Sequence, residues 1–133
     1  MLADQQQPSI WIVFEHQLKG KAPSAFERVQ YLEQPTARNL AAMVENVPAG
    51  SHWGVIGISR DQWMLVAAAL TLGGSIRVGL EDNLYLPDGR MASSNGELIA
   101  KARQMTEDVG RRPATVAEAR AMLGVSRPAG SPA

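Results

Sequence analysis

Short apolar runs alternate with amphipathic helical segments along this chain, and this alternation constrains its fold more than any other feature. Residues 10–14, 52–57 and 75–80 are rich in β-branched, aromatic or other apolar residues, a composition typical of buried strands. Helical periodicity follows each run. Because strands joined by helices run parallel, the pattern predicts an α/β sheet covered by helices and connected by right-handed crossovers.

Helix-start signals precede three of the predicted helices. Pro35-Thr36 begins the first helix, and the segments 94–97 and 115–118 are capping-box patterns that begin the last two. The helix after residue 57 stops at Gly73-Gly74. The apolar residues that share one helical face in the three longer helices are Leu40, Met43, Val44, Val47, Trp63, Val66, Ala67, Leu70, Leu98, Ala102, Met105 and Val109.

The composition restricts the kinds of partner. Thirteen basic and thirteen acidic residues cancel, so the chain lacks the positive charge that binding to nucleic acid or an anionic membrane requires. The absence of cysteine excludes disulfides, thiolate metal ligands and cysteine nucleophiles, and fits a reducing compartment. No segment has the pattern of a signal peptide or of a membrane-spanning helix. We therefore expect a cytoplasmic protein that binds a small molecule or another protein.

Three strands are few for a fold of this class. A doubly wound domain usually has more, and a closed (β/α)8 barrel takes roughly 250 residues, whereas this chain has 133. The pattern is that of the end of a larger fold.

The stretch from Arg77 to Asp82 carries the most distinctive charge pattern in the chain. Alternate residues of a strand share a face, so Arg77, Gly79 and Glu81 are expected to point the same way. In a parallel barrel this places Glu81 at the carboxyl end of a strand, facing the interior, with Asp82 at the start of the next loop. Gly79 leaves space for a ligand or for the arginine side chain.

The role of Arg77 is open on spacing alone. It lies about 13 Å from Glu81 along an extended strand, so a direct contact requires its long side chain to reach towards the opening. It can instead hold a substrate carboxylate or steady Asp82. A structural network of arginine and carboxylates is as consistent with this spacing as a functional site.

These residues and several others resemble the C-terminal part of the β-keto acid cleavage enzymes, the family that includes 3-keto-5-aminohexanoate cleavage enzyme. The segment 73–85 is the specific part of the resemblance, and 53–60 is similar to the family's penultimate barrel strand and turn. The supporting matches are Ser94, Asn95, Leu98, the run 110–115, the run 117–120, Leu123 and Gly124.

The resemblance implies a fold and a reaction. Members are (β/α)8 barrels that bind a divalent metal, usually zinc, and condense a β-keto acid with acetyl-CoA to give acetoacetate and a new CoA thioester. On this basis the chain is the last three βα units of a barrel, incomplete when isolated. It would comprise a polar N-terminal segment (1–8), a partial barrel domain (9–125) whose strands resemble barrel strands six to eight, and a flexible tail (126–133).

The resemblance also implies roles for individual residues. Glu81 would be a metal ligand, Asp82 the catalytic carboxylate beside the metal, and Arg77 its partner in positioning and tuning. Asn83, Ser59 and Arg60 are weaker candidates for binding a substrate or an anion. Ser59 and Arg60 precede a helix, where free N–H groups and the helix dipole favour an anion, although the simpler interpretation makes Ser59 a helix N-cap.

The metal site would be incomplete in this chain. The family supplies two further ligands from a His-X-His pair, whereas the histidines here are His16, placed in a loop, and His52, at the far end of its strand. Catalytic zinc usually takes three protein ligands. The chain alone is therefore expected to be inactive and to need the missing N-terminal barrel half or a second copy. The alternative is a truncated or split, non-catalytic fragment that acts as a structural or binding module.

Overall fold

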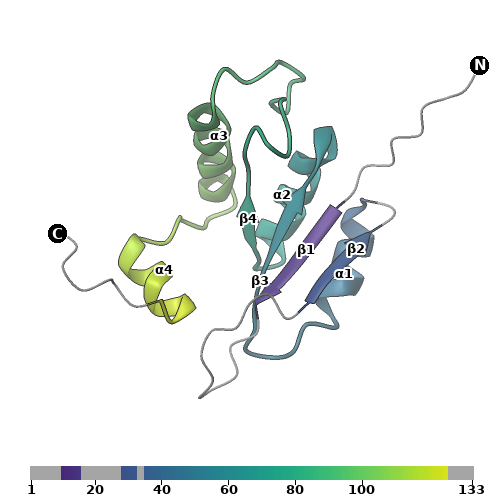
Figure 1. Ribbon diagram of the computed structural model, residues 1–133, viewed down its shortest axis with the longest axis vertical. Helices are drawn as coiled ribbons and strands as arrows, with labels where there is room; N and C mark the ends of the chain where they lie inside the picture. Colours follow the sequence, from purple (N-terminus) through teal and green to yellow (C-terminus); the bar gives the residue numbers. More distant parts are fainter. Residues whose placement is uncertain (1–9, 16–27, 33–34, 126–133) are drawn as a thin grey trace, which may run out of the picture.

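The computed structural model describes residues 10–15, 28–32 and 35–125 (Figure 1). The elements in chain order are β1 (Ile10–Glu15), β2 (Arg28–Leu32), α1 (Ala37–Val44), β3 (His52–Gly57), the 3₁₀ turn η1 (Ser59–Asp61), α2 (Gln62–Thr71), β4 (Ser75–Arg77), α3 (Asn95–Asp108) and α4 (Val116–Leu123). The fold is thus of the expected α/β class.

The four strands form one sheet in the order β2-β1-β3-β4. β3 and β4 are parallel, with Gly54 opposite Ser75 and Ile56 opposite Arg77. β1 is antiparallel to both of its neighbours, β2 and β3. Because β1 runs opposite to each of them, β2, β3 and β4 point the same way. The series β2, α1, β3, α2, β4 therefore consists of parallel strands with a helix between each consecutive pair.

The prediction that residues 10–14 begin this parallel series is wrong. They do form a strand, β1, but it is antiparallel to β3, and the first parallel strand is β2. β2 escapes prediction because polar Arg28 and Gln30 interrupt its apolar run. Parallel pairing of β1 with β2 would usually need a crossover helix between them. The sequence of residues 16–27 contains Gly20 and Pro23 and lacks helical periodicity, so it favours antiparallel pairing.

The three predicted helix starts are confirmed. Thr36 caps α1 by accepting a hydrogen bond from the N–H of Asn39 at 3.1 Å. Ser94 caps α3, and Thr115 forms a complete capping box with Glu118 at the start of α4. None of the helices in the described ranges has the length and apolar composition that would let it cross a membrane.

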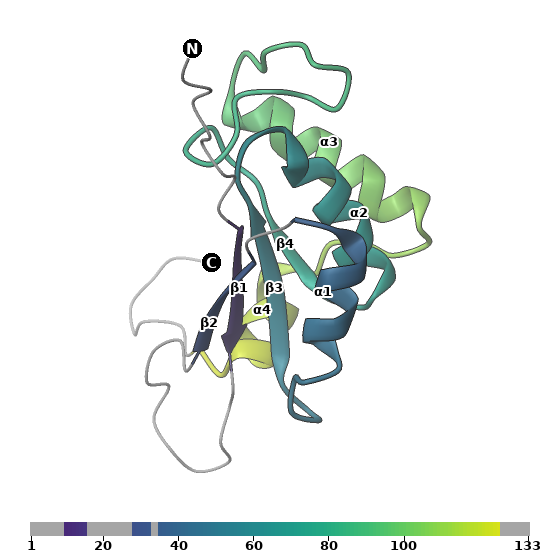
Figure 2. The same cartoon turned by 90° about the vertical axis from the view of Figure 1, so that its right-hand side faces the viewer.

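Helix α2 lies at the centre of the core, between two clusters of buried side chains. On one side, Leu65 and Ala69 pack with Leu40 of α1 and Val55 of β3. The cluster on the other side joins α2 to α3 and to the loop before it, and consists of Trp63, Val66, Leu70, Leu86, Ala92, Leu98 and Ala102. Figure 2 shows α1, α2 and α3 on the same side of the sheet. Because α2 is covered on two sides, its sequence is apolar around most of its circumference.

The end of β3 approaches the start of α2 so closely that a side chain cannot fit between them. A Cβ atom at Gly57 would lie 2.6 Å from the Cα of Gln62, which is a backbone atom and cannot move without shifting the helix. Gln62 itself is fully buried. Glycine at 57 therefore fixes the distance between the sheet and the beginning of α2.

We expect Gly57→Ala to lower the free energy of unfolding by about 1–3 kcal/mol, because it overpacks this contact. Gly96→Ala is the matched control. Gly96 lies in the first turn of α3 and a Cβ there would meet the Ser94 Oγ at an ordinary 3.5 Å, so alanine should stabilise the helix by about 0.5–1 kcal/mol. Urea unfolding measures both. Equal effects of the two substitutions would contradict the steric argument.

The connection between α3 and α4 is tied to the far end of α2 by Arg111. Its Nη1 donates to the carbonyl of Leu70 at 3.0 Å and to the carbonyl of Gly74 at 2.8 Å. Leu70 belongs to the last turn of α2, whose carbonyl groups have no partner within the helix. A cation at this end also interacts favourably with the helix dipole. Arg111 thus links α2, the start of β4 and the segment that leads to α4.

Arg111→Ala should lower the free energy of unfolding by about 1–2 kcal/mol, because two charge-assisted hydrogen bonds to the main chain are lost. Arg103→Ala is the control, since Arg103 pairs with Glu107 one turn later on α3 and its side chain is 69% exposed. That substitution should change stability by no more than about 0.5 kcal/mol. Chemical unfolding of the two variants, followed by circular dichroism, distinguishes these expectations.

Candidate active site

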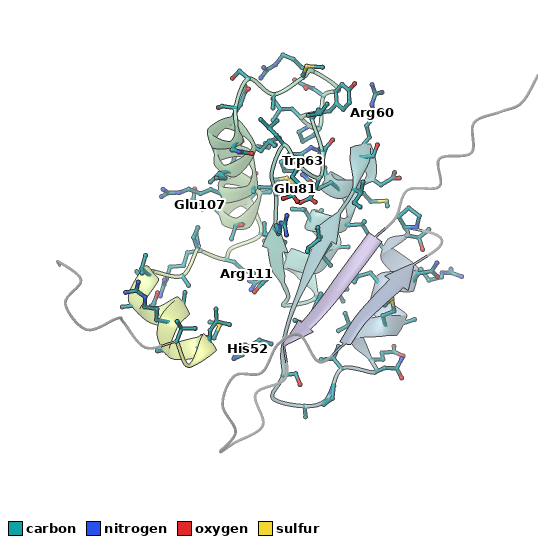
Figure 3. All side chains as sticks on the ribbon, in the orientation of Figure 1. His52, Arg60, Trp63, Glu81, Glu107 and Arg111 are labelled. Carbon is teal, nitrogen blue, oxygen red and sulfur yellow. The ribbon has the colours of Figure 1, made fainter. Side chains whose placement is uncertain are left out.

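The candidate site lies where the two parallel strands β3 and β4 end side by side. The residues that follow each strand are in direct contact, because the N–H of Ser59 donates to the carbonyl of Asp82 at 2.9 Å. Figure 3 shows Glu81, Trp63 and Arg60 at this end of the sheet. The carboxyl ends of parallel strands are where α/β proteins usually bind their ligands.

β4 is shorter than predicted, and this changes how the charged residues are arranged. The sequence predicts a strand to Leu80, but the strand ends at Arg77. The N–H groups of Asp82 and Asn83 both donate to the carbonyl of Gly79, each at 3.1 Å, so the chain turns back on itself. The expected strand alternation that places Arg77 and Glu81 on one face is therefore wrong. The turn brings these two residues together instead.

Arg77 binds both carboxylates that follow it. Its Nη2 donates to Glu81 Oε2 at 2.6 Å, and its Nε lies 3.2 Å from Asp82 Oδ2. The Glu81 side chain is 80% exposed, whereas that of Asp82 is only 12% exposed. Two adjacent carboxylates would repel each other, and the guanidinium group between them offsets this repulsion. Contact between Arg77 and Glu81 does not require the long reach along an extended strand that the sequence suggests.

The environment of Asp82 raises the pKa of its carboxyl group. Burial is the largest cause and raises the pKa of this carboxyl, while the charge of Arg77 lowers it and the charge of Glu81 raises it further. Although Oδ2 is within ion-pair distance of Arg77, it makes no hydrogen bond and is shielded from solvent. A carboxyl with a raised pKa beside a cation is suited to taking up and releasing a proton.

Asn83 is buried and its side chain closes the loop. Its Nδ2 donates to the carbonyl of Tyr85 at 2.6 Å, and the N–H of Tyr85 donates to Asn83 Oδ1 at 3.0 Å. Asn83 is 3% exposed. Both polar atoms of the amide are thus used within the loop, and its role in binding a substrate stays a prediction.

Ser59 and Arg60 contact the same loop, but not as expected. The interpretation of Ser59 as a helix N-cap is wrong, because Ile58 precedes η1, Asp61 precedes α2, and neither makes a side-chain cap. Ser59 has a φ of 64°, which directs its N–H to Asp82. The exposed Arg60 places its guanidinium carbon 4.6 Å from the centre of the Tyr85 ring. Anion binding by these two residues stays a prediction.

Two further residues hold the loop, and the sequence alone assigns neither of them to the site. Trp63 Nε1 donates to the carbonyl of Tyr85 at 2.7 Å. Asn95 Oδ1 accepts a hydrogen bond from the N–H of Leu80 at 2.8 Å. The sequence favours packing for Trp63, and its ring is indeed buried. The role of Trp63 could have been suspected from the sequence, because the indole N–H of a buried tryptophan needs a hydrogen-bond acceptor.

The donors in the described part of the chain do not form a complete metal site. Among residues 35–125, whose side chains the structure describes, no group of three or more histidine, cysteine, aspartate or glutamate residues could hold a metal. Glu81 and Asp82 offer two carboxylates, and Arg77 contacts both. His52 begins β3, at the opposite end from the site (Figure 3). His16 lies outside the described residues. Zinc in a catalytic site usually takes three protein ligands, so this set alone does not fit it.

A sequence profile described as beta-keto acid cleavage enzyme matches residues 22–125. The chain belongs to the β-keto acid cleavage enzyme family. The resemblance seen in the segment 73–85 is thereby confirmed, and the match includes every candidate site residue named above.

Characterised members of the family are similar to this chain over part of their length. The chain is 42% identical to the 3-keto-5-aminohexanoate cleavage enzyme of Fusobacterium nucleatum, over 69% of this chain and 34% of that protein. It is 45% identical to the 3-oxoadipate:acetyl-CoA acetyltransferase of Cupriavidus necator, over 55% of this chain and 26% of the relative. The match spans about a third or less of the length of these relatives.

The loop that follows the site is fastened to α3 by Glu97. Its carboxylate pairs with Arg90 and accepts hydrogen bonds from the N–H and the hydroxyl of Ser93 at 2.8 and 2.9 Å. The contact with Arg90 is the main cause, and Ser93 the second, of a pKa lowered from 4.5 to about 2. The negative charge in the first turn of α3 also complements the helix dipole.

We expect this contact to add stability above pH 4.5 and to lose it progressively as the pH falls from about 4.5 to about 2. The sign follows because the unfolded chain binds the proton more readily than the folded one. Glu97→Gln should therefore lower stability at pH 7 and weaken the dependence of stability on pH in this range. Urea unfolding between pH 2 and 7 tests both.

Proposed function

We propose that this chain is the C-terminal portion of a β-keto acid cleavage enzyme that uses acetyl-CoA as co-substrate. The observation that carries the proposal is the cluster of Arg77, Glu81 and Asp82 at the ends of two parallel strands, within the segment that matches the family. The name of the Cupriavidus relative specifies transfer to acetyl-CoA, which supports this class of reaction.

The proposed reaction exchanges one acyl group for another. A β-keto acid and acetyl-CoA give acetoacetate and a new CoA thioester, so the atoms balance without an oxidant or reductant. Asp82, with its raised pKa, would move the proton that carbon–carbon bond formation and cleavage require. Arg77 would offset the negative charge that develops on the reacting oxygens. Substrate binding by Asn83, Ser59 and Arg60 belongs to the same proposal.

Glu81 is the carboxylate that this chain would contribute to a divalent metal, as its exposed position allows. The remaining ligands would have to come from residues that the structure does not describe or from another chain, and we assign no step of the reaction to the metal. The chain alone would therefore be inactive. This incomplete ligand set is the reason for proposing that the site is shared.

We further propose that residues 9–125 are a partial barrel domain, in which the series from β2 to α3 forms the last three βα units, flanked by a polar segment (1–8) and a flexible tail (126–133). Two observations support the need for a partner, either an N-terminal barrel half or a second copy. Helix α4 has no buried residue. β4 pairs with β3 alone among the described strands, which leaves its other edge open. The balanced charge of the chain argues against nucleic-acid and anionic-membrane partners, and its lack of cysteine fits a reducing compartment such as the cytoplasm.

A second candidate is a non-catalytic fragment that acts as a structural or binding module. The specific observation in its favour is that Arg77 already contacts both Glu81 and Asp82. In a purely structural network the three charges satisfy one another, and neither carboxylate needs a metal or a substrate. The two candidates differ in whether the addition of the missing units produces activity.

The deciding experiment combines this chain with the N-terminal two-thirds of the Fusobacterium relative, in the presence of zinc, 3-keto-5-aminohexanoate and acetyl-CoA. Gel filtration reports whether a complex forms, and acetoacetate release reports turnover. We expect no turnover from either part alone and measurable turnover from the complex. Asp82→Asn should reduce the rate by about 10²-fold or more, because proton transfer is lost.

Asp108→Asn is the control for this experiment, because Asp108 ends α3 on an exposed surface. It should leave turnover unchanged. A stable, zinc-loaded complex that releases no acetoacetate would contradict the enzymatic proposal and support the structural module.

A further inference from the structure

The loop that carries Glu81 and Asp82 is held by two neutral side chains and one main-chain N–H group, all of which bind its main chain and not its carboxylates. Its main chain is bound from outside at three points: Leu80 by Asn95, Asp82 by Ser59, and Tyr85 by Trp63. These three contacts come from α3, from the turn after β3, and from α2. Glu81 lies between the first two points, so its main chain has little freedom to move.

Trp63 fixes the end of this loop relative to the core. It is the second residue of α2, its side chain is 6% exposed, and its ring packs in the cluster that includes Leu86 and Leu98. The indole N–H donates to the Tyr85 carbonyl at 2.7 Å. Packing fixes the position of the ring, and the short hydrogen bond transmits that position to the loop. Within the described residues, this carbonyl also accepts a hydrogen bond from Asn83 Nδ2, which belongs to the loop itself.

Asn95 fixes the beginning of the loop. It is the first residue of α3, directly after the N-cap Ser94, so its main chain is set by the helix. Its Oδ1 accepts the N–H of Leu80 at 2.8 Å. This N–H follows the end of β4, where the ladder to β3 has stopped, and it would otherwise lack a partner in the sheet.

We propose that Trp63 and Asn95 are positioning residues, which hold the loop 80–85 so that Glu81 and Asp82 meet Arg77. Their significance for catalysis rests on the proposed function, but the positioning itself does not. Arg77 is fixed by its place at the end of β4, whereas both carboxylates belong to the loop. Release of either end of the loop should therefore separate the carboxylates from the guanidinium group.

The test compares two variants that each remove one hydrogen bond. Trp63→Phe removes the N–H donor and keeps an aromatic ring in the cluster. Asn95→Ala removes the acceptor from an exposed position, where misfolding is not expected. Leu65→Val is the matched control, because Leu65 is fully buried in α2 but packs in the other cluster, away from the loop. It should cost stability without releasing the loop.

Two signals of the 133-residue chain report the position of the loop. The first is the Arg77 Nε–H resonance in ¹H–¹⁵N spectra, since this group lies 3.2 Å from Asp82 Oδ2. The second is hydrogen exchange of the Ser59 amide, whose acceptor is the Asp82 carbonyl. In Trp63→Phe and Asn95→Ala we expect the Arg77 resonance to shift and the Ser59 amide to exchange about tenfold faster, as the loss of one hydrogen bond predicts.

Leu65→Val should leave the Arg77 resonance in place and increase the Ser59 exchange rate no more than that of other protected amides. The proposal is overturned if Trp63→Phe and Asn95→Ala leave both signals at their original values, or if Leu65→Val changes them to the same extent. Neither signal requires metal, substrate or turnover. Failure here would therefore leave the proposed reaction open, and failure of the reconstituted enzyme would leave the positioning result standing.

Discussion

The burial of α2 on two sides is the constraint on which the rest of the structure depends. One side covers β3 and α1, and the other receives α3 and the loop after β4. Because the helix is fixed by packing on both sides, its two ends can serve as reference points for polar contacts. The first turn of α2 contains Trp63 and comes soon after Ser59, and these two residues bind the loop 80–85. The last turn accepts Arg111. Apolar packing thus comes first, and the position of the charged residues follows from it.

The site combines one cation with two carboxylates that differ in burial. Arg77 stands between the exposed carboxylate of Glu81 and the largely buried carboxylate of Asp82. Burial raises the pKa of Asp82, whereas the side chain of Glu81 stays largely exposed to solvent although it pairs with Arg77. Two carboxylates of different environment beside one cation can divide proton transfer and ligand binding between them.

The sequence predicts the local features of this protein better than its long-range pairing. Helix starts at Thr36, Ser94 and Thr115 follow from side chains that bond the main chain three residues later, so neighbouring residues suffice to identify them. The antiparallel direction of β1 depends on which distant strand it pairs with, and no periodicity encodes that choice.

At the candidate site, too, the sequence identifies neighbouring residues better than contacts between distant ones. The charge pattern identifies Arg77, Glu81 and Asp82 together because they lie close in sequence. The turn at Gly79 that brings them into contact depends on main-chain hydrogen bonds, which the charge pattern does not reveal. The contributions of Trp63 and Asn95 are hidden for a different reason, because each acts on a main-chain atom of a residue 15 or 22 positions away.

Helix α4 differs from the rest of the structure in where its stability comes from. None of its residues is buried, yet it has a complete capping box, an ion pair between Arg112 and Glu118, and a left-handed Gly124 at its end. A helix of eight residues that buries none of them is only marginally stable through its termini, so it should open more readily than the core. Its opening would expose little apolar surface. The described part of the chain therefore ends in a helix that would gain stability if another surface covered it.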